Sequence, residues 1–251
     1  ISTQQSIANY ECAQAWFDLG ATRVVLAREC SLKEVAEIRA KVDPKLEIET
    51  FGHGAMCVSY SGRCLLSNYM TGRDSNRGAC AQPCRYQYAL MEEKRPGEYF
   101  PVYEDEKGTY ILNSRDMCMI DHLKDLMDAG VDCIKIEGRA KSAYYAAIVT
   151  GAYRHVINDI VAGREIDKVW RDEVDHVSHR IYSTGFYFGE PGQYTEHSRY
   201  IREWQIVAKV ESCDENGLAV CSLNNKFRIG DELEIVGPDL RPFTFNAADI
   251  R

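Results

Sequence analysis

Several common signatures are missing from this sequence of 251 residues. It contains neither H-E-x-x-H, the signature of zinc proteases, nor G-x-S-x-G, the nucleophile turn of serine hydrolases. No apolar run approaches the roughly 20 residues of a membrane-spanning helix, and no signal peptide is visible. We expect no membrane partner, and the cysteine usage described next favours a reducing cytoplasm.

Positive charge is also scarce. The formal net charge is −8, which argues against a broad surface for gripping phosphates. Ten cysteines in a chain of this length are too dilute for a small disulfide scaffold. In a reducing compartment a cluster of cysteines indicates a metal or redox site.

Strand-like and helix-like patterns alternate in the first two thirds of the chain. We expect strands at 22–27, 46–51, 109–112 and 131–136, and helices at 4–19, after Ser31, after Ser114 and at 141–162. This alternation predicts an α/β fold with parallel strands. Because a closed barrel takes about 250 residues, these units predict either a small open α/β sheet or the second half of a barrel. The chain starts directly before a helix, where a preceding strand should be ending, so we favour the second alternative, partial TIM-barrel-like βα units.

Three regions follow from these patterns. Residues 1–165 are predicted to be the half-barrel, with a long cysteine-rich insertion at 53–108 that has no periodicity. Residues 166–194 read as a linker. Short strands separated by turn residues predict a small all-β barrel domain at 195–251.

Four cysteines in the insertion have the spacing C-x6-C-x15-C-x3-C. Soft thiolate ligands favour zinc or an iron–sulfur cluster. Zinc sites usually contain two close cysteine pairs, and only the last pair is close here, so the spacing favours a cluster over zinc or over no metal. Cys118 is an alternative fourth ligand, although a thiol packed in the core explains it more simply. The predicted ligands are Cys57, Cys64, Cys80 and Cys84.

A second group of charged residues lies at the ends of predicted strands. Strand alternation places Lys135 and Glu137 on the inward face of a barrel. Arginine binds carboxylates bidentately, so the group predicts a pocket for an anionic small molecule. A structural ion-pair network is the alternative. The group comprises Arg28, Glu49, His53, Lys135, Glu137 and Arg139.

Residues 53–85 of the insertion hold four arginines against one acid, Asp74, with tyrosines among them. RNA is commonly recognised in unpaired loops by stacking and backbone contacts, so this stretch predicts an RNA-binding surface. A solvated loop is an equally good interpretation. The arginines are Arg63, Arg73, Arg77 and Arg85.

At this point the residues carry a resemblance. The stretch ETFGHGAMCVSYSGRCLLS, Glu49 to Ser67, matches every fixed position of E-x-F-x-x-G-[SA]-x-C-x4-G-x-C-x-[LIVM]-S. That pattern resembles the signature of the collagenase-like peptidase family U-32. NRGACAQPCR, RPGEYF, GTYILNSRDM and KIEGRAKSAYY are also similar to that family, so the likeness covers essentially the whole chain.

The resemblance is strongest to the family's TrhP-type branch, and it implies several properties. They are hydroxylation of the tRNA wobble uridine to 5-hydroxyuridine, a prephenate-like carboxylate as co-substrate, and a [4Fe-4S] cluster held by four cysteines, with Cys84 preferred to Cys118. It further implies that the chain lacks the first part of the family's barrel. A homo-oligomer, or a partner supplying that part, is therefore a further expectation.

Two other functions stay open at this stage. A peptidase would need a base beside a catalytic thiol, and His53 with Cys57 could form such a dyad. That dyad leaves the other three cysteines of the insertion unexplained. The third possibility is a zinc-stabilised binding module without chemistry.

Overall fold

The computed structural model describes residues 1–86, 89–90, 100–101, 114–192, 200–237 and 240–248. Contacts divide the chain into two compact units. The first comprises Ile1–Ala140 with His179–Tyr200, and the second comprises Lys141–Ser178 with Ile201–Arg251. Each unit is described here by itself. The sequence-based boundaries at 165 and 195 stay predictions.

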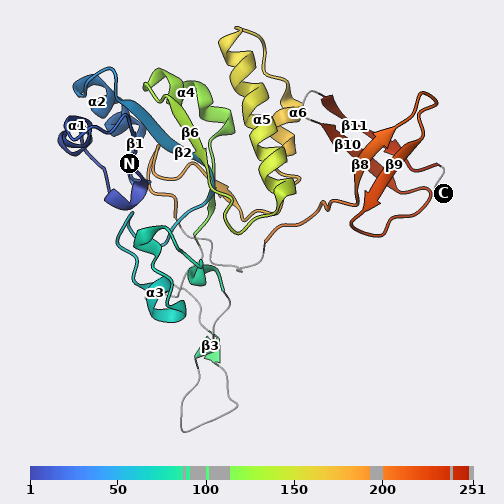
Figure 1. The fold of residues 1–251 in the computed structure, drawn as a ribbon, viewed down its shortest axis with the longest axis horizontal. Helices are drawn as coiled ribbons and strands as arrows, with labels where there is room; N and C mark the ends of the chain where they lie inside the picture. The colour runs from blue at the N-terminus through green and yellow to red at the C-terminus, as the bar shows by residue number, and fades with distance from the viewer. Residues whose placement is uncertain (87–88, 91–99, 102–113, 193–199, 238–239, 249–251) are drawn as a thin grey trace. The chain divides into compact units, whose positions relative to one another are not determined.

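The first unit is built around the long strand β2 (Figure 1). Its elements are η1 Thr3–Gln5, α1 Tyr10–Asp18, β1 Arg23–Val25, α2 Leu32–Lys41, β2 Glu47–Ala55, β5 Asp116–Cys118, η4 Ile120–His122, α4 Leu123–Asp128, β6 Cys133–Ile136 and β7 Tyr182–Ser183. Strands β1 and β6 both run parallel to β2. Helix α1 contacts both β1 and α2. The predicted alternation of strands and helices is therefore confirmed for the start of the chain.

Strand β5 departs from the predicted all-parallel arrangement. It pairs antiparallel with the end of β2, with His53 opposite Cys118 and Ala55 opposite Asp116. Strand β7 then runs parallel to β5. Mixed pairing of this kind does not build a βα barrel, and no closed barrel is present in the described residues. The mixed α/β class is confirmed, and the partial TIM barrel is not.

Local signals explain where the helices begin. In α2 the Ser31 hydroxyl accepts from the Glu34 amide, and the Glu34 carboxylate accepts from the Ser31 amide, which is the predicted capping box. Asn9 caps α1 through the Cys12 amide. The buried side chains of α2 are Val35 and Ile38.

The predicted helix after Ser114 is wrong in its first turn. Residues Asp116–Cys118 form β5, and α4 begins only at Leu123. Met117, Leu123 and Leu126 are buried as the helical pattern required. Buried side chains spaced three or four residues apart cannot distinguish a helix from a strand that is followed by a helix. The predicted strand at 109–112 lies outside the described residues.

The cysteine-rich insertion contains only short elements where the structure describes it. They are α3 Leu66–Thr71, η2 Ser75–Arg77, η3 Pro83–Arg85, and the antiparallel pair β3 Ala89–Leu90 and β4 Phe100–Pro101. This agrees with the lack of periodicity in its sequence. The rest of the predicted insertion, up to residue 108, lies outside the described residues.

The second unit combines helices with two hairpins. Its elements are α5 Ala143–Val161, α6 Lys168–Glu173, β8 Ala208–Cys213, β9 Ala219–Leu223, β10 Glu232–Gly237 and β11 Leu240–Asn246. Strand β8 pairs with β9 and β10 pairs with β11, each antiparallel. Described strand pairs do not join the two hairpins, so the predicted β-barrel domain is not confirmed.

None of the described helices combines the length and the apolar character that a membrane crossing requires. The predicted cytoplasmic location stays a prediction.

Candidate functional site

The candidate site begins where β2 ends. Gly54 has φ +109°, and a Cβ there would lie 2.2 Å from the carbonyl oxygen of Glu137. Only glycine allows this close approach, because an L-residue would be strained and would also collide with the backbone. Gly54 therefore brings the exit of β2, just before Cys57, against the exit of β6 at Glu137.

One pocket collects the predicted cysteines and several of the charged residues. Its volume is about 290 Å³. The lining includes Cys57, Cys64, Cys80, Cys84, Arg28, Arg85, Lys135, Glu137 and Arg139. All four cysteines are free thiols. The structure thus brings together sulfur atoms that span residues 57–84 of the chain.

The sulfur atoms lie too far apart for a mononuclear site. Within the described part of the chain, no three cysteine sulfurs lie within 4.8 Å of one another. Tetrahedral zinc with Zn–S bonds of about 2.3 Å holds its sulfurs about 3.8 Å apart. A polynuclear centre places its ligands farther apart, so the donor set fits an iron–sulfur cluster better than a zinc ion.

Side chains replace regular structure in positioning these cysteines. Asn76 holds Cys64 from both sides: its oxygen accepts from the Cys64 amide at 3.0 Å, and its nitrogen donates to the Cys64 carbonyl at 2.9 Å. The backbone amide of Gln82 donates to the Cys80 sulfur at 3.3 Å. Gln82 itself has φ 56°, a left-handed conformation that is rare for a residue with a side chain. Such backbone strain tends to occur at functional sites.

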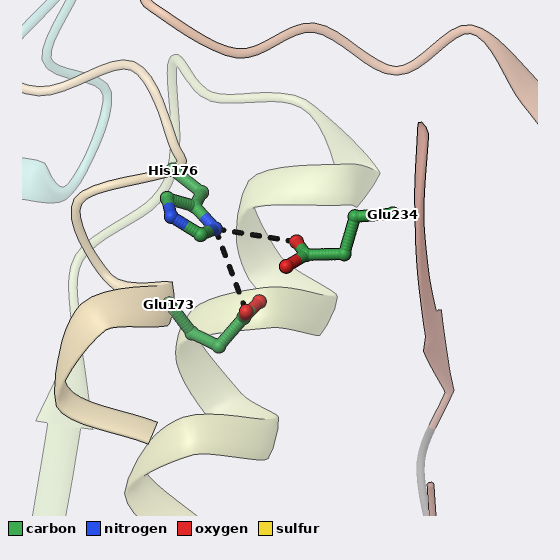
Figure 2. A group of neighbouring side chains, drawn as sticks. All are labelled: Glu173, His176 and Glu234. Carbon is green, nitrogen blue, oxygen red and sulfur yellow. Dashed lines mark ion pairs between the residues drawn. The ribbon is translucent and has the colours of Figure 1, made fainter. Parts of the chain in front are cut away.

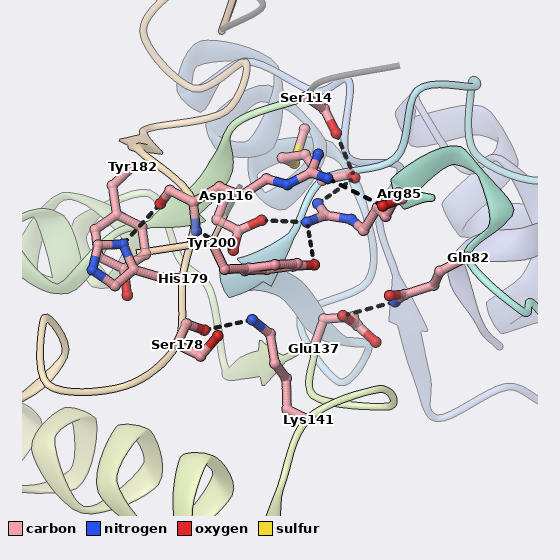
Figure 3. Close-up of polar contacts among 12 residues, drawn as sticks. Gln82, Arg85, Ser114, Asp116, Glu137, Lys141, Ser178, His179, Tyr182 and Tyr200 are labelled. Carbon is pink, nitrogen blue, oxygen red and sulfur yellow. Dashed lines mark hydrogen bonds and ion pairs between the residues drawn. The ribbon is translucent and has the colours of Figure 1, made fainter. Parts of the chain in front are cut away.

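Arg85 anchors both ends of the segment that carries the four cysteines (Figure 3). Its guanidinium forms an ion pair with Asp116 at 2.8 Å and donates to the Met56 carbonyl at 3.0 Å. It also donates to the Tyr200 hydroxyl at 3.2 Å. Met56 precedes Cys57 and Arg85 follows Cys84, so one side chain ties the first and last cysteines to β5.

The electrostatics of Arg85 reflect this network. Burial alone would lower the pKa of its guanidinium, but the charge and hydrogen-bond interactions with Asp116 and Tyr200 together outweigh burial and raise the pKa. The side chains of Arg85 and Asp116 are only 4% and 2% exposed. A guanidinium held in this way does not fit the predicted RNA-facing surface, so the structure gives Arg85 a positioning role instead.

Arg28 provides positive charge inside the pocket. Its guanidinium lies over the Phe51 ring at 4.0 Å, and its buried Nε makes no hydrogen bond within the described residues. Burial lowers the pKa of Arg28, and the nearby groups Cys57 and Glu137 act in the opposite direction. A buried donor without a partner is costly unless an anion reaches it. This donor supports an anionic occupant of the pocket.

The thiols have different proton affinities. Burial raises the pKa of Cys84 to about 11 and also raises the pKa of Cys57. For Cys64, burial acts in the same direction, but hydrogen bonds from Ser75, Ser59 and the backbone of Ser67 and Leu66 together outweigh it and lower the pKa. Metal ligation requires thiolates and therefore releases protons from the buried cysteines.

The remaining predicted residues fall in several places. Glu49 is not in the pocket lining, and it pairs with Lys135 at 3.7 Å and with Arg23 at 3.5 Å. His53 is also outside the lining; it is 1% exposed, and its Nε2 lies 3.5 Å from the Tyr182 hydroxyl. Cys118 is buried in β5 and does not line the pocket.

Three of the four predicted RNA-binding arginines are exposed, namely Arg63, Arg73 and Arg77. The Arg77 side chain is 87% exposed and lies 3.5 Å from Asp74. Tyr60 and Tyr69, from the same segment, are 73% and 86% exposed. Exposed arginines and aromatic rings occur together here, as the sequence suggested.

Sequence reasoning missed the groups that support the site. Asp116, Tyr200 and the Met56 carbonyl hold Arg85, and Asn76 holds Cys64. Nothing in the sequence pairs Arg85 with an acid so far along the chain. The position of Asn76 among serine and glycine did signal a turn, and turns are where such side chains bond to the backbone.

Comparisons with known proteins show the family of the chain. The model of peptidase family U32 matches residues 1–197, and that of the peptidase family U32 C-terminal domain matches residues 202–251. The tRNA hydroxylation protein P1 of Bacillus subtilis (strain 168) is 40% identical over 97% of this chain and 59% of its own length. The tRNA hydroxylation protein P of Escherichia coli (strain K12) is 36% identical over 95% of this chain and 62% of its own.

A relative with a different name also aligns. A protein named collagenase from Porphyromonas gingivalis (strain ATCC BAA-308 / W83) is 32% identical over 95% of this chain and 60% of its own length. The chain thus spans about 60% of the length of these curated relatives. No solved structure matches it significantly.

Proposed function

This chain belongs to peptidase family U32, and on that basis we propose that it takes part in hydroxylating a base of tRNA. Two similar relatives carry the name tRNA hydroxylation protein, and both align with nearly all of this chain. In its specific form, the proposal is conversion of the wobble uridine to 5-hydroxyuridine with a prephenate-like carboxylate as co-substrate.

One observation carries the proposal: four free thiols and several cationic groups line the same pocket. A peptidase needs one activated nucleophile, whereas four converging thiols suit a metal cluster. We propose that Cys57, Cys64, Cys80 and Cys84 hold an iron–sulfur cluster. Both their spacing in the sequence and the separation of their sulfur atoms argue against zinc.

An iron–sulfur cluster supplies one-electron redox chemistry when bound. The residues of this chain have other tasks around it. Asn76 and Arg85 fix the backbone on either side of the ligands. The positive charge of Arg28 offsets part of the negative charge that four thiolates bring into a partly buried pocket.

The pocket cations support binding of a small carboxylate. The buried Nε of Arg28 has no hydrogen-bond partner in the described part of the chain, and Lys135 and Arg139 line the same pocket. A guanidinium binds a carboxylate through paired hydrogen bonds, which fixes its orientation as well as its position. The volume of about 290 Å³ is at the small end of ligand pockets and suits a compact metabolite.

The exposed part of the insertion supports contact with RNA. Arg63, Arg73 and Arg77 supply charge for phosphates, and Tyr60 and Tyr69 supply rings on which unpaired bases stack. These side chains come from the segment whose cysteines line the pocket. An unpaired tRNA loop held there would have a base close to the proposed cluster.

The test is mass spectrometry of tRNA nucleosides from a strain that lacks the full gene and is complemented with variants. We expect Cys57→Ser and Cys84→Ser to abolish 5-hydroxyuridine. Cys118→Ala and the exposed-site control Cys213→Ala should retain it. Full modification with Cys84→Ser would remove Cys84 from the ligand set, and full modification with both serine variants would refute the proposal.

A peptidase is the second candidate, because one relative is named collagenase. The predicted thiol–histidine dyad has little support, since the His53 ring faces Tyr182 and does not line the pocket. Collagen cleavage that Cys57→Ala abolishes and Cys84→Ala leaves intact would favour the peptidase. The third candidate, a zinc-stabilised module, predicts a colourless protein after anaerobic preparation. That protein would contain stoichiometric zinc, and mutation of the four cysteines would remove the zinc.

A further inference from the structure

Three side chains of the second unit point toward one another (Figure 2). Glu173 is the last residue of α6, His176 follows three residues later, and Glu234 lies in β10. The Nδ1 atom of His176 lies 3.4 Å from a Glu173 oxygen and 3.3 Å from a Glu234 oxygen. The three ligand atoms all lie within 4.8 Å of one another.

The polar atoms at the centre of this cluster are buried and unsatisfied. The Glu173 side chain is 1% exposed, and neither of its carboxylate oxygens makes a hydrogen bond with the residues that the structure describes. Among the same residues, the buried His176 Nδ1 atom also has no hydrogen-bond partner. A buried carboxylate without a hydrogen-bond partner is strongly unfavourable, so the arrangement needs a group that binds at its centre.

The charges of the cluster are unbalanced. Within the described residues, His176 is the only group that forms an ion pair with Glu173 or Glu234. Two carboxylates beside one imidazole leave a net negative charge whether or not the imidazole is protonated. A divalent cation beside a neutral imidazole neutralises both carboxylates, which is the usual solution for buried charges that lack salt-bridge partners.

The separations match those around a tetrahedral metal ion. Zinc binds imidazole nitrogen and carboxylate oxygen at about 2.0–2.2 Å, which places neighbouring ligand atoms about 3.4 Å apart in a tetrahedron. The measured separations are 3.4 and 3.3 Å. Magnesium and calcium prefer oxygen ligands alone, so the imidazole favours zinc.

We propose that Glu173, His176 and Glu234 bind one zinc ion. Three protein ligands leave the fourth position of a tetrahedral site for water or another ligand. Trp204 stacks on the His176 ring with centroids 4.0 Å apart and an angle of 22°, which fixes the orientation of the imidazole. The ion would join α6 to β10 and so stabilise the second unit.

The experiment measures thermal unfolding of the whole chain with and without added zinc. At a zinc concentration about a hundred times Kd, we expect the Tm of the wild type to rise by about 5–10 °C. Glu173→Gln and Glu234→Gln should lose this rise. Glu232→Gln, an exposed site on the same strand β10, should keep it.

If zinc binds the cysteines instead, Tm should rise equally in the wild type and in all three variants, and that result would overturn the proposal. The absence of any rise in the wild type would overturn it too. Zinc X-ray absorption of the wild type provides a second readout that does not depend on the variants folding. Nitrogen and oxygen neighbours at about 2.0 Å support the site, whereas sulfur neighbours at about 2.3 Å alone contradict it.

Discussion

Arg85 and Asp116 form an ion pair that water hardly reaches, with side chains 4% and 2% exposed. Removing one partner of such a pair leaves an uncompensated charge in a poorly polarisable environment. The surface pair of Lys124 and Asp128 is different, because its side chains are 68% and 63% exposed and water solvates either charge alone.

We predict that Asp116→Asn lowers the free energy of unfolding by about 3–5 kcal/mol. The matched change Asp128→Asn should alter it by less than about 1 kcal/mol. Urea denaturation of both variants measures the difference. Equal effects of the two substitutions would show that the Arg85 network does not anchor the cysteine segment.

Gly62, which lies between Cys57 and Cys64, is a second sensitive position. Its φ is +72°, and a Cβ there would lie 2.0 Å from the carbonyl oxygen of Gln4. Gly72 has a similar φ of +69° but no atom within 4 Å of a Cβ. Substitution of Gly72 therefore tests backbone strain alone, whereas substitution of Gly62 tests backbone strain together with a steric collision.

We predict that Gly72→Ala costs about 1–2 kcal/mol through the left-handed backbone alone. Gly62→Ala should cost about 1–3 kcal/mol more, because the backbone of Gln4 must also move. Equilibrium unfolding measures both changes. A smaller effect at Gly62 than at Gly72 would contradict the close packing of the insertion against the N-terminal residues.

The grouping of four cysteines around one pocket could be predicted from the sequence, while the contacts of Arg85 could not. Thiols have few uses in a reducing compartment, so their grouping already predicted a common centre. An arginine in a glycine- and serine-rich stretch has the same sequence signature whether it is solvated or buried against Asp116. Only the folded chain shows which of these occurs.

At the scale of elements, α2 depends on its capping box. The Ser31 backbone amide, and then its hydroxyl, donate to the Glu34 carboxylate and lower its pKa from the usual 4.5. A lowered folded-state pKa stabilises the protein above the ordinary pKa, and this contribution is lost as pH falls through the folded-state value.

We predict that the wild type is more stable than Glu34→Gln at pH 7 and that the difference shrinks as pH falls below about 4.5. Glu37→Gln, on the same helix, removes only an exposed pair with Lys41 and should cost about 0.3–0.5 kcal/mol at pH 7. Denaturation at a series of pH values tests this. A difference for Glu34→Gln that is constant from pH 7 to pH 3 would contradict it.

Strand β5 shows why element type was harder to predict than burial. Met117, Leu123 and Leu126 were correctly expected to face inward. Their spacing also fits a helix, and the antiparallel partner that makes 116–118 extended is the distant end of β2. Nonlocal pairing overrode the local pattern, as it often does for short strands.

At the scale of the whole molecule, net charge and local charge oppose each other. A chain with net charge −8 repels nucleic acid overall. Binding of tRNA would therefore depend on the exposed arginines of the insertion. The predicted homo-oligomer, or a partner that supplies further barrel elements, stays a prediction.

We predict that replacing Arg63, Arg73 and Arg77 by alanine weakens tRNA binding and reduces its salt dependence, by about 0.7 in the log–log slope for each lost phosphate contact. A control that replaces the exposed Lys124, Arg164 and Lys226 removes the same charge elsewhere. Titrations at several salt concentrations measure both. Equal slopes for the two triple variants would indicate a general charge effect without a specific surface.

The pairing of Ala55 with Asp116 has a consequence for how this family can vary. The segment that carries the four cysteines leaves the sheet after Ala55 and rejoins it at Asp116, and these two residues pair with each other. Its length is therefore not coupled to the register of β2 with β5. Doubling such a segment costs only about 0.6 kcal/mol in closure entropy. A change in its length therefore need not shift the pairing of β2 with β5, provided that the contacts of Arg85 with Asp116 and of Gly62 with Gln4 are kept.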